Sequence, residues 1–189
     1  MTGYHPVLLR AEIDAVLADW AWHLDHGDYA AVAALFTQDA LFVTGAVELR
    51  GRPAIENRYT ERVAARSTRH TYSGLRVSPL AGDASAGGGG ASGAGGDVDG
   101  GGGGVDGAGG GAVDSGDGRP ARVRARSTWV NFAVNAPAPV DGAPVDEVGV
   151  YLVADFDDVL TWCDDERWRI SERRIIPVFR DPSRAPRTG

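Results

Sequence analysis

The stretch WAWHLDHGDYAAVAALFTQDALFV, from Trp20 to Val43, decides the fold because it passes from a helix through a cap and a second helix into a strand. Apolar residues at helical spacing predict a first helix from about Leu8 to His26, which a histidine-glycine pair ends. Asp28 is a good N-cap for a short second helix. The run Ala40 to Thr44 then predicts a strand. The stripe residues are Ile13, Val16, Leu17, Trp20 and Leu24 in the first helix and Tyr29, Val32, Leu35 and Phe36 in the second.

Outward from this stretch, the chain continues with one more helix and then with strands. Glu48 to Arg50 can pair back onto the first strand, and Pro53 suits the first turn of a third helix. That helix has an apolar stripe of Ile55, Tyr59 and Val63. Four long β-rich segments follow, at Thr68 to Leu80, Ala121 to Asn135, Val148 to Trp162 and Trp168 to Phe179. Helices first and strands afterwards predict an α+β fold in which one curved, mainly antiparallel sheet wraps the helices.

The composition indicates a single domain over residues 1–189. About half of the residues between Gly82 and Gly118 are glycine, so we expect a disordered insertion at the tip of a hairpin. We also expect the tail, at about 181–189, to fray. The net charge of -7 and the pI near 5.0 argue against nucleic acid as a partner. With one cysteine, no secretory signal and no long apolar run, we expect a cytoplasmic protein that does not span a membrane.

Four pieces of the sequence, in the same order, carry a family resemblance. They are the Trp20 to Val43 stretch, GRPAIENRY from Gly51, STRHTYSGLRV from Ser67 and RWRISERRIIPVF from Arg167. Together they resemble SnoaL-like domains of the nuclear transport factor 2-like superfamily. The resemblance implies a cone-shaped barrel around an apolar pocket, and a homodimer. It implies several functions, because the superfamily includes polyketide cyclases, ketosteroid isomerases, dehydratases and proteins that only bind or transport.

Asp25 and His70 are the candidate catalytic residues. In dehydratases of the superfamily, an acidic residue at the end of the first helix faces a histidine on the strand after the third helix, and the resemblance places Asp25 and His70 there. A carboxylate can hold an imidazole in one tautomer while the other ring nitrogen moves a substrate proton, with no cofactor. By helical periodicity alone, however, Asp25 belongs to the surface. His70 could equally be a hydrogen-bonded core residue.

Four further residues are candidates for substrate binding. Trp20 stands where the dehydratases commonly have a tyrosine, so it offers a bulky wall and an indole N–H but no proton to relay. Tyr72 shares a strand face with His70, and strand parity makes Asn131 a candidate ligand for a substrate oxygen. Parity also turns Arg174 inward with Trp168 and Ile170. A cross-strand salt bridge for Arg174 and an amide held by the sheet edge for Asn131 are the alternatives.

The leading hypothesis is a cofactor-independent lyase or isomerase that acts on a hydrophobic ring compound such as a polyketide or steroid-like molecule. His70 would move a proton next to a carbonyl, Asp25 would orient it, and Asn131 or Arg174 would stabilise the enolate. No metal is predicted, because the His23 and His26 pair lacks an obvious third ligand. The alternative is a non-catalytic ligand carrier or accessory subunit, which the tryptophan at position 20 favours.

Overall fold

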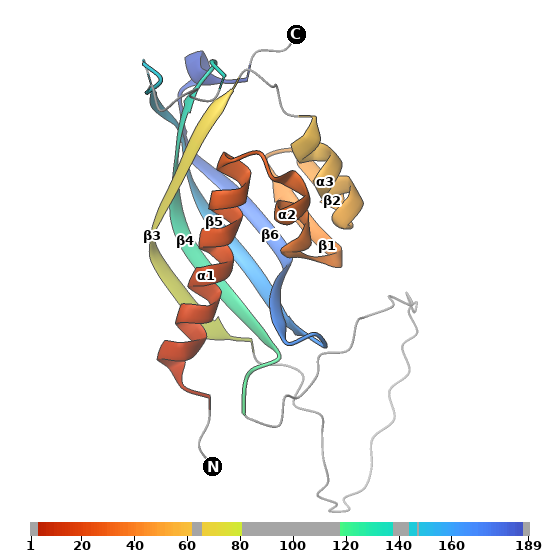
Figure 1. The fold of residues 1–189 in the computed structure, drawn as a ribbon. Helices are drawn as coiled ribbons and strands as arrows, with labels where there is room; N and C mark the ends of the chain where they lie inside the picture. The colour runs from red at the N-terminus through yellow and green to blue at the C-terminus, as the bar shows by residue number, and fades with distance from the viewer. Residues whose placement is uncertain (1–3, 62–65, 81–117, 138–143, 147, 187–189) are drawn as a thin grey trace, which may run out of the picture.

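The computed structural model describes residues 4–61, 66–80, 118–137, 144–146 and 148–186. The helices are α1 (Pro6–Asp25), α2 (Tyr29–Ala34) and α3 (Arg52–Thr60). The strands are β1 (Phe36–Thr44), β2 (Val47–Arg50), β3 (Ser67–Pro79), β4 (Arg122–Val134), β5 (Gly149–Cys163) and β6 (Arg167–Arg180). This order of helices and strands confirms the α+β prediction (Figure 1).

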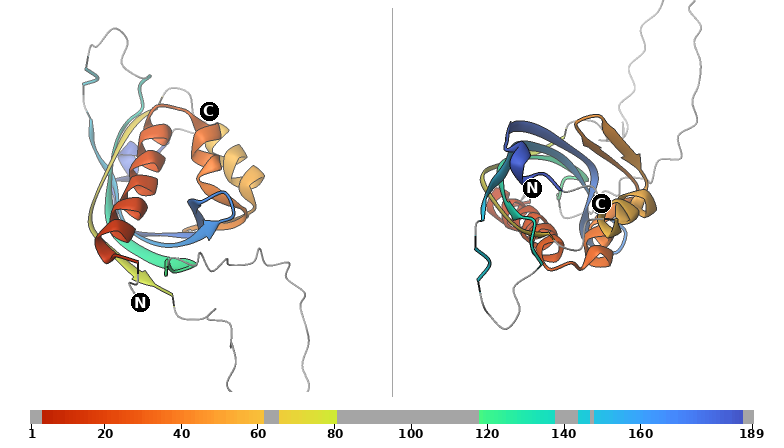
Figure 2. Two further views of the ribbon diagram at one scale, coloured as in Figure 1. Left: turned by 60° about the horizontal axis from the view of Figure 1, so that its bottom comes forward. Right: turned by 90° about the horizontal axis from the view of Figure 1, so that it is seen from above.

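One curved sheet forms the body of the molecule, with the strand order β2-β1-β6-β5-β4-β3. Every neighbouring pair is antiparallel except β1 and β6, which are parallel. Long β3, β4, β5 and β6 bend around the helices, and all three helices lie on the concave side (Figure 2). The opposite face of the sheet carries no helix among the described residues. The expected curved sheet around N-terminal helices is therefore confirmed.

Local signals in the sequence explain the helix boundaries. The Asp28 carboxylate accepts a hydrogen bond of 3.1 Å from the Ala31 backbone N–H, which caps α2 as predicted. Gly27 has φ of 77° just after α1, a conformation that glycine adopts at little steric cost. Phe36 starts β1 instead of ending the second helix, because α2 stops at Ala34. Val63, the last predicted stripe residue of the third helix, lies outside the described residues.

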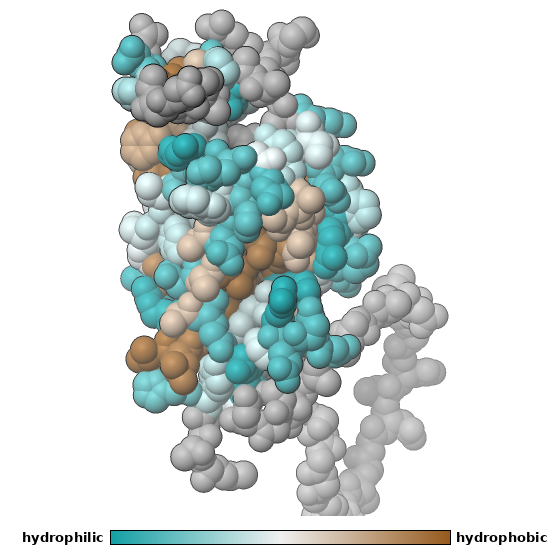
Figure 3. Space-filling model, viewed as in Figure 1, coloured by the Kyte–Doolittle hydropathy of each residue, from teal (hydrophilic) through white to brown (hydrophobic). Residues whose placement is uncertain are grey.

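The core lies between the helices and the concave face of the sheet. Ile13, Leu17 and Trp20 of α1 are almost fully buried, as are Trp129 of β4 and Ile170 of β6. Each buried side chain of this size stabilises the fold by about 1.5–3 kcal/mol through the hydrophobic effect. On the helical side the surface is mostly hydrophilic, with an apolar patch over the start of α1 (Figure 3).

The inward direction predicted for Arg174 is wrong. The register between β5 and β6 shifts between the pairs Val159–Glu172 and Leu160–Ile170, so β6 carries an extra residue there. Such a bulge reverses the alternation of side chains beyond it. Arg174 therefore lies on the outer face with its side chain 48% exposed, 2.5 Å from Glu172 Oε1. The salt bridge expected as the alternative is present, although it joins two residues of the same strand.

Arg173 takes the inward position instead, in the fully buried interior. Its Nε and Nη2 donate to the two carboxylate oxygens of Asp158, each at 2.8 Å. The guanidinium carbon also lies 4.3 Å from the centre of the Trp20 ring. A bidentate pair and an aromatic contact compensate for burying this charge.

Two segments were predicted to be disordered, the glycine-rich insertion and the C-terminal tail. The glycine-rich insertion falls on residues 81–117, outside the described residues. The tail, by contrast, forms a short 3₁₀ helix η1 (Pro182–Arg184). Asn135 Nδ2 donates to the carbonyl of Ala185 at 3.0 Å, so the chain is held there instead of fraying from residue 181. Within the described residues, no helix has the length and apolar character needed to cross a membrane.

Variants of two neighbouring arginines test the buried ion pair between Arg173 and Asp158. We expect Arg173→Met to lower the free energy of unfolding by roughly 3–5 kcal/mol, because it leaves the Asp158 carboxylate buried without its partner. Arg174→Met, the matched control on the outer face, should change it by less than about 1 kcal/mol. Combining Arg173→Met with Asp158→Leu should restore most of the loss. Urea unfolding measures all three variants, and equal losses for the two single variants would contradict the assignment.

Candidate functional site

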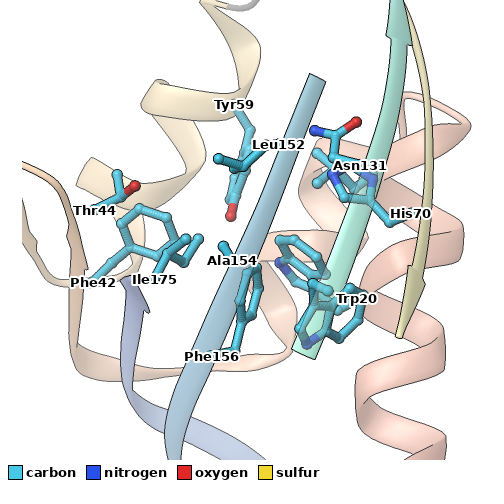
Figure 4. Close-up of a pocket in the computed structure, with 12 residues that line it drawn as sticks. Trp20, Phe42, Thr44, Tyr59, His70, Asn131, Leu152, Ala154, Phe156 and Ile175 are labelled. Atoms are coloured by element: carbon cyan, nitrogen blue, oxygen red, sulfur yellow. The ribbon is translucent and has the colours of Figure 1, made fainter. Parts of the chain in front are cut away.

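A cavity of about 130 Å³ lies between the helices and the concave face of the sheet (Figure 4). Its apolar wall consists of Leu24, Phe42, Leu152, Ala154, Phe156 and Ile175. Its other lining residues carry polar atoms and are Trp20, Thr44, Tyr59, His70, Trp129 and Asn131. The wall is thus mostly apolar with a few polar groups, as in sites that bind small organic molecules.

The structure brings Asp25 and His70 together: His70 lines this cavity, whereas Asp25 lies behind it and, with His70, lines a second hollow between α1 and β3. Asp25 is the last residue of α1, and its Oδ1 lies 2.6 Å from His70 Nδ1 on β3. The backbone N–H of His70 donates to Asp25 Oδ2 at 2.6 Å, and the Thr68 hydroxyl donates to Oδ1 at 2.8 Å. The side chains of His70 and Asp25 are only 7% and 5% exposed. The carboxylate therefore holds the imidazole through one ring nitrogen and leaves Nε2 for other partners.

The surroundings of Asp25 keep it ionised. Burial alone would raise its pKa, but the His70 ring, the His70 backbone N–H and the Thr68 hydroxyl together lower the pKa below the ordinary 3.8. Hydrogen bonds to the charged form are the physical cause of this shift. An ionised Asp25 can stabilise a positive charge on His70 when that ring takes up a proton.

Trp20 forms the wall next to His70. The two ring centres lie 5.5 Å apart in an edge-on arrangement, and Trp20 also meets Trp129 at 5.2 Å and Phe156 at 5.7 Å. Its indole Nε1 is buried and has no hydrogen-bond partner among the described residues. The Trp129 indole, by contrast, donates to the Ser127 hydroxyl at 2.8 Å. Trp20 thus presents a bulky wall with an unused donor.

Asn131 lies directly opposite His70 on the neighbouring strand β4. Both residues line the cavity, and Figure 4 shows their side chains together at one end of it. Asn131 Oδ1 is buried and accepts no hydrogen bond within the described part of the chain. The sheet edge therefore does not satisfy this oxygen, which was the alternative for Asn131.

Tyr72 does not line this cavity, and its predicted part in substrate binding stays a prediction. Its ring stacks on Trp129 at 4.4 Å, and its hydroxyl donates to Asp14 Oδ1 at 2.8 Å. Burial and the Asp14 carboxylate raise the pKa of Tyr72 above its usual range. The strand parity was correct, but α1 covers this position. Tyr72 instead borders the second hollow, of about 360 Å³, between α1 and β3.

Sequence reasoning missed several lining residues. Tyr59 counts in the sequence only as a stripe residue of α3, yet Figure 4 shows its hydroxyl directed into the cavity. Leu152, Ala154 and Phe156 alternate along β5, and the same parity argument applied to that strand would have found them. Thr44 at the end of β1 has no signal in the sequence, because its place depends on how the sheet curls.

The histidines near the end of α1 are engaged in local contacts. His23 Nδ1 lies 3.5 Å from a carboxylate oxygen of Asp28, and the His26 ring stacks on Trp22 at 4.1 Å. Among the residues that the structure describes, no group of three or more His, Cys, Asp and Glu side chains is placed to hold a metal ion.

The lowered pKa of Asp25 predicts a dependence of stability on pH. The ionised carboxylate stabilises the folded protein above about pH 4, and this contribution is lost as the pH falls through the lowered pKa. We expect Asp25→Asn to be less stable than the wild type by roughly 1–3 kcal/mol near neutral pH. The difference should shrink towards about pH 2 in urea unfolding measured across this range. A difference that stays constant with pH would contradict the assignment.

Solved structures of other proteins are similar to this fold. A protein from Catenulispora acidiphila in complex with S-DNPA has a TM-score of 0.59 and 19% identity, over 90% of this chain and 94% of that one. A scytalone dehydratase-like protein from Novosphingobium aromaticivorans has a TM-score of 0.59 and 14% identity, over 92% and 86%. ActVI-ORFA from Streptomyces coelicolor has a TM-score of 0.59 and 17% identity, over 89% of this chain and 96% of that one. At these identities the likeness shows the fold.

Comparison of the sequence with family models identifies the family. None of the curated proteins matches the chain. The family model of the SnoaL-like domain, however, matches residues 6–174, which includes all three helices and most of the sheet. The chain therefore belongs to the family of SnoaL-like domains.

Proposed function

We propose that the protein is a cofactor-independent lyase or isomerase that acts on a hydrophobic ring ketone. The observation that carries this proposal is the buried hydrogen bond of 2.6 Å between Asp25 and His70, at the wall of a mostly apolar cavity. An imidazole held in this way is suited to general acid–base catalysis near neutral pH. A structurally similar protein is described as scytalone dehydratase-like, which supports chemistry of this class.

The proposed reaction begins with a proton transfer to His70. Its Nε2 takes a proton from the carbon next to the substrate carbonyl, and the electron pair of that C–H bond forms an enolate. In a β,γ-unsaturated ketone the protonated ring then returns the proton to the γ-carbon, which is an isomerisation. In a β-hydroxy ketone the enolate forms a C=C bond as the β-hydroxyl departs, and this hydroxyl takes the proton and leaves as water. Asp25 orients the ring and stabilises its positive charge in both cases.

Donors in the cavity wall support the enolate step. Trp20 Nε1 is buried without a partner among the described residues, so it can donate to the developing oxyanion. Tyr59 adds a hydroxyl on another wall of the cavity. Asn131, beside His70, is placed to bind a further oxygen of the substrate. Arg174 has no part in this scheme, because it lies on the outer face.

A second function, in which the protein only binds its ligand, rests on Trp20. The resemblance expects a tyrosine there, and an indole cannot relay a proton. The same cavity would then serve a ligand carrier or an accessory subunit, and the buried Asp25–His70 pair would have a structural role. Activity measurements on variants of this pair separate the two functions.

We also propose a homodimer through the outer face of the sheet. Val153 alternates with the lining residues Leu152 and Ala154, so it and its partner Phe179 lie on the outer face. Phe179 is 69% exposed, and Ile176, paired with Asp155, is also exposed on that face. Exposed apolar side chains gathered on one sheet face are typical of protein interfaces.

The catalytic pair is tested by hydrogen exchange. Enolisation swaps the protons next to a ring carbonyl for deuterium in D₂O, and ¹H NMR follows this for a panel that includes cyclohexanone and 2-tetralone. We expect the wild type to accelerate exchange for at least one of these ketones. Asp25→Asn and His70→Ala should each lower the rate by about 10²–10⁴-fold, as for the loss of a general base.

Matched controls keep the test specific. Asp19→Asn changes an exposed residue of the same helix, and His26→Ala removes an exposed ring, so both should keep the wild-type rate. All variants should show wild-type circular dichroism. If the wild type accelerates exchange and both Asp25→Asn and His70→Ala keep that rate, the proposed mechanism is wrong. If no ketone of the panel exchanges faster with the wild type, the binding function is favoured.

The dimer is tested with a charge on the outer face. We expect light scattering to give twice the mass of the chain for the wild type and the mass of one chain for Phe179→Glu, because the carboxylate would be buried without a partner. Val7→Glu, which changes an exposed residue at the start of α1, should leave the dimer intact. A monomeric wild type would refute the proposal.

A further inference from the structure

The size of the cavity limits what it can enclose. Its volume is about 130 Å³, and its lining side chains come from the helices and strands that surround it. An apolar cavity of about 150 Å³ in another protein is known to hold one benzene molecule. The space beside His70 therefore matches a single six-membered ring in volume, whereas a fused second ring would have to stay outside the cavity or displace its wall. Well-packed interiors resist such displacement.

The polar atoms of the wall add a chemical pattern to this size. Asn131 Oδ1 is an acceptor without a donor among the described residues, and Trp20 Nε1 is a donor without an acceptor. A buried polar atom without a partner destabilises a fold, so each of these atoms is satisfied when a ligand supplies the complementary group. The amide of Asn131 can pair with a hydroxyl on the ligand, which both donates and accepts, and the Trp20 donor calls for a carbonyl oxygen.

The side chains of Asn131 and Trp20 both line the cavity, as does that of His70. Asn131 is the cross-strand partner of His70, and the Trp20 ring centre lies 5.5 Å from the His70 ring centre. A ring that satisfies both atoms would therefore have its edge against His70. We propose that the substrate is a single six-membered ring that carries a hydroxyl group as well as the ketone. This inference rests on the proposed function, because it takes the cavity to be the substrate site.

The walls suggest why larger rings are excluded. Leu152 of β5 lines the cavity, and its neighbour Val153 lies on the opposite face of the same strand. Shortening Leu152 would enlarge the cavity by several methyl-sized groups, whereas shortening Val153 would not change it. This pair of positions separates an effect on cavity size from a general effect on the strand.

Three small probes test size and hydroxyl recognition by titration calorimetry with the whole chain. Phenol has one ring and a hydroxyl, toluene has the ring alone, and 2-naphthol has a second fused ring. We expect the wild type to bind phenol at least ten-fold more tightly than 2-naphthol. It should bind phenol about five-fold more tightly than toluene, the effect of one neutral hydrogen bond.

The variants assign these preferences to residues. Asn131→Leu should bring the phenol-to-toluene ratio close to one, whereas Thr128→Val, which changes an exposed residue of the same strand outside the cavity, should keep the wild-type ratio. Leu152→Ala should improve 2-naphthol binding about ten-fold, and Val153→Ala should not. The wild-type comparison of phenol with 2-naphthol stands even if one of these variants does not fold.

The outcomes are distinct from those of the proton-exchange test. Binding of 2-naphthol to the wild type as tight as that of phenol would overturn the single-ring inference and leave the catalytic pair untouched. An unchanged phenol-to-toluene ratio in folded Asn131→Leu would overturn the hydroxyl assignment. Absence of binding by all three probes would overturn the whole inference, while the exchange of ketones would still decide whether Asp25 and His70 are catalytic.

Discussion

The attachment of α1 to β3 through Asp25 is the interaction on which the site depends. One carboxylate receives hydrogen bonds from the Thr68 hydroxyl and the His70 backbone, and binds the His70 ring. These contacts fix the end of the helix against the strand, and they fix the rotamer of the histidine at the same time. Because charge-assisted hydrogen bonds are short and directional, one residue sets both the packing of two elements and the geometry of the cavity wall.

The elements of the fold were readable from the sequence, because local chemistry determines them. The cap at Asp28 and the helical spacing of apolar residues placed the first two helices within a few residues, and β-rich runs located the four long strands. The directions of individual side chains were harder to predict. An extra residue in β6 turns Arg173 inward in place of Arg174. No local sequence pattern predicts this bulge.

The candidate site shows the same division between local and tertiary information. Helical periodicity puts Asp25 on the surface, and only the resemblance paired it with His70. The structure buries it because β3 runs alongside the end of α1, which is a tertiary contact that no period encodes. Tyr72 shows the converse, since its strand parity was right but α1 covers it. Periodicity thus predicts which face a residue takes, and the packing of distant elements decides what that face meets.

The polar atoms of this interior differ in how fully the described residues satisfy them. The Asp25 carboxylate is fully engaged with its neighbours, and Arg173 is held to Asp158 by two hydrogen bonds behind the Trp20 ring. Selection for stability alone would also favour a partner for Asn131 Oδ1, or an apolar residue at that position. Under the proposed function, a polar amide in the cavity wall, next to a histidine already fixed in orientation, is a cost to folding that a bound molecule would offset.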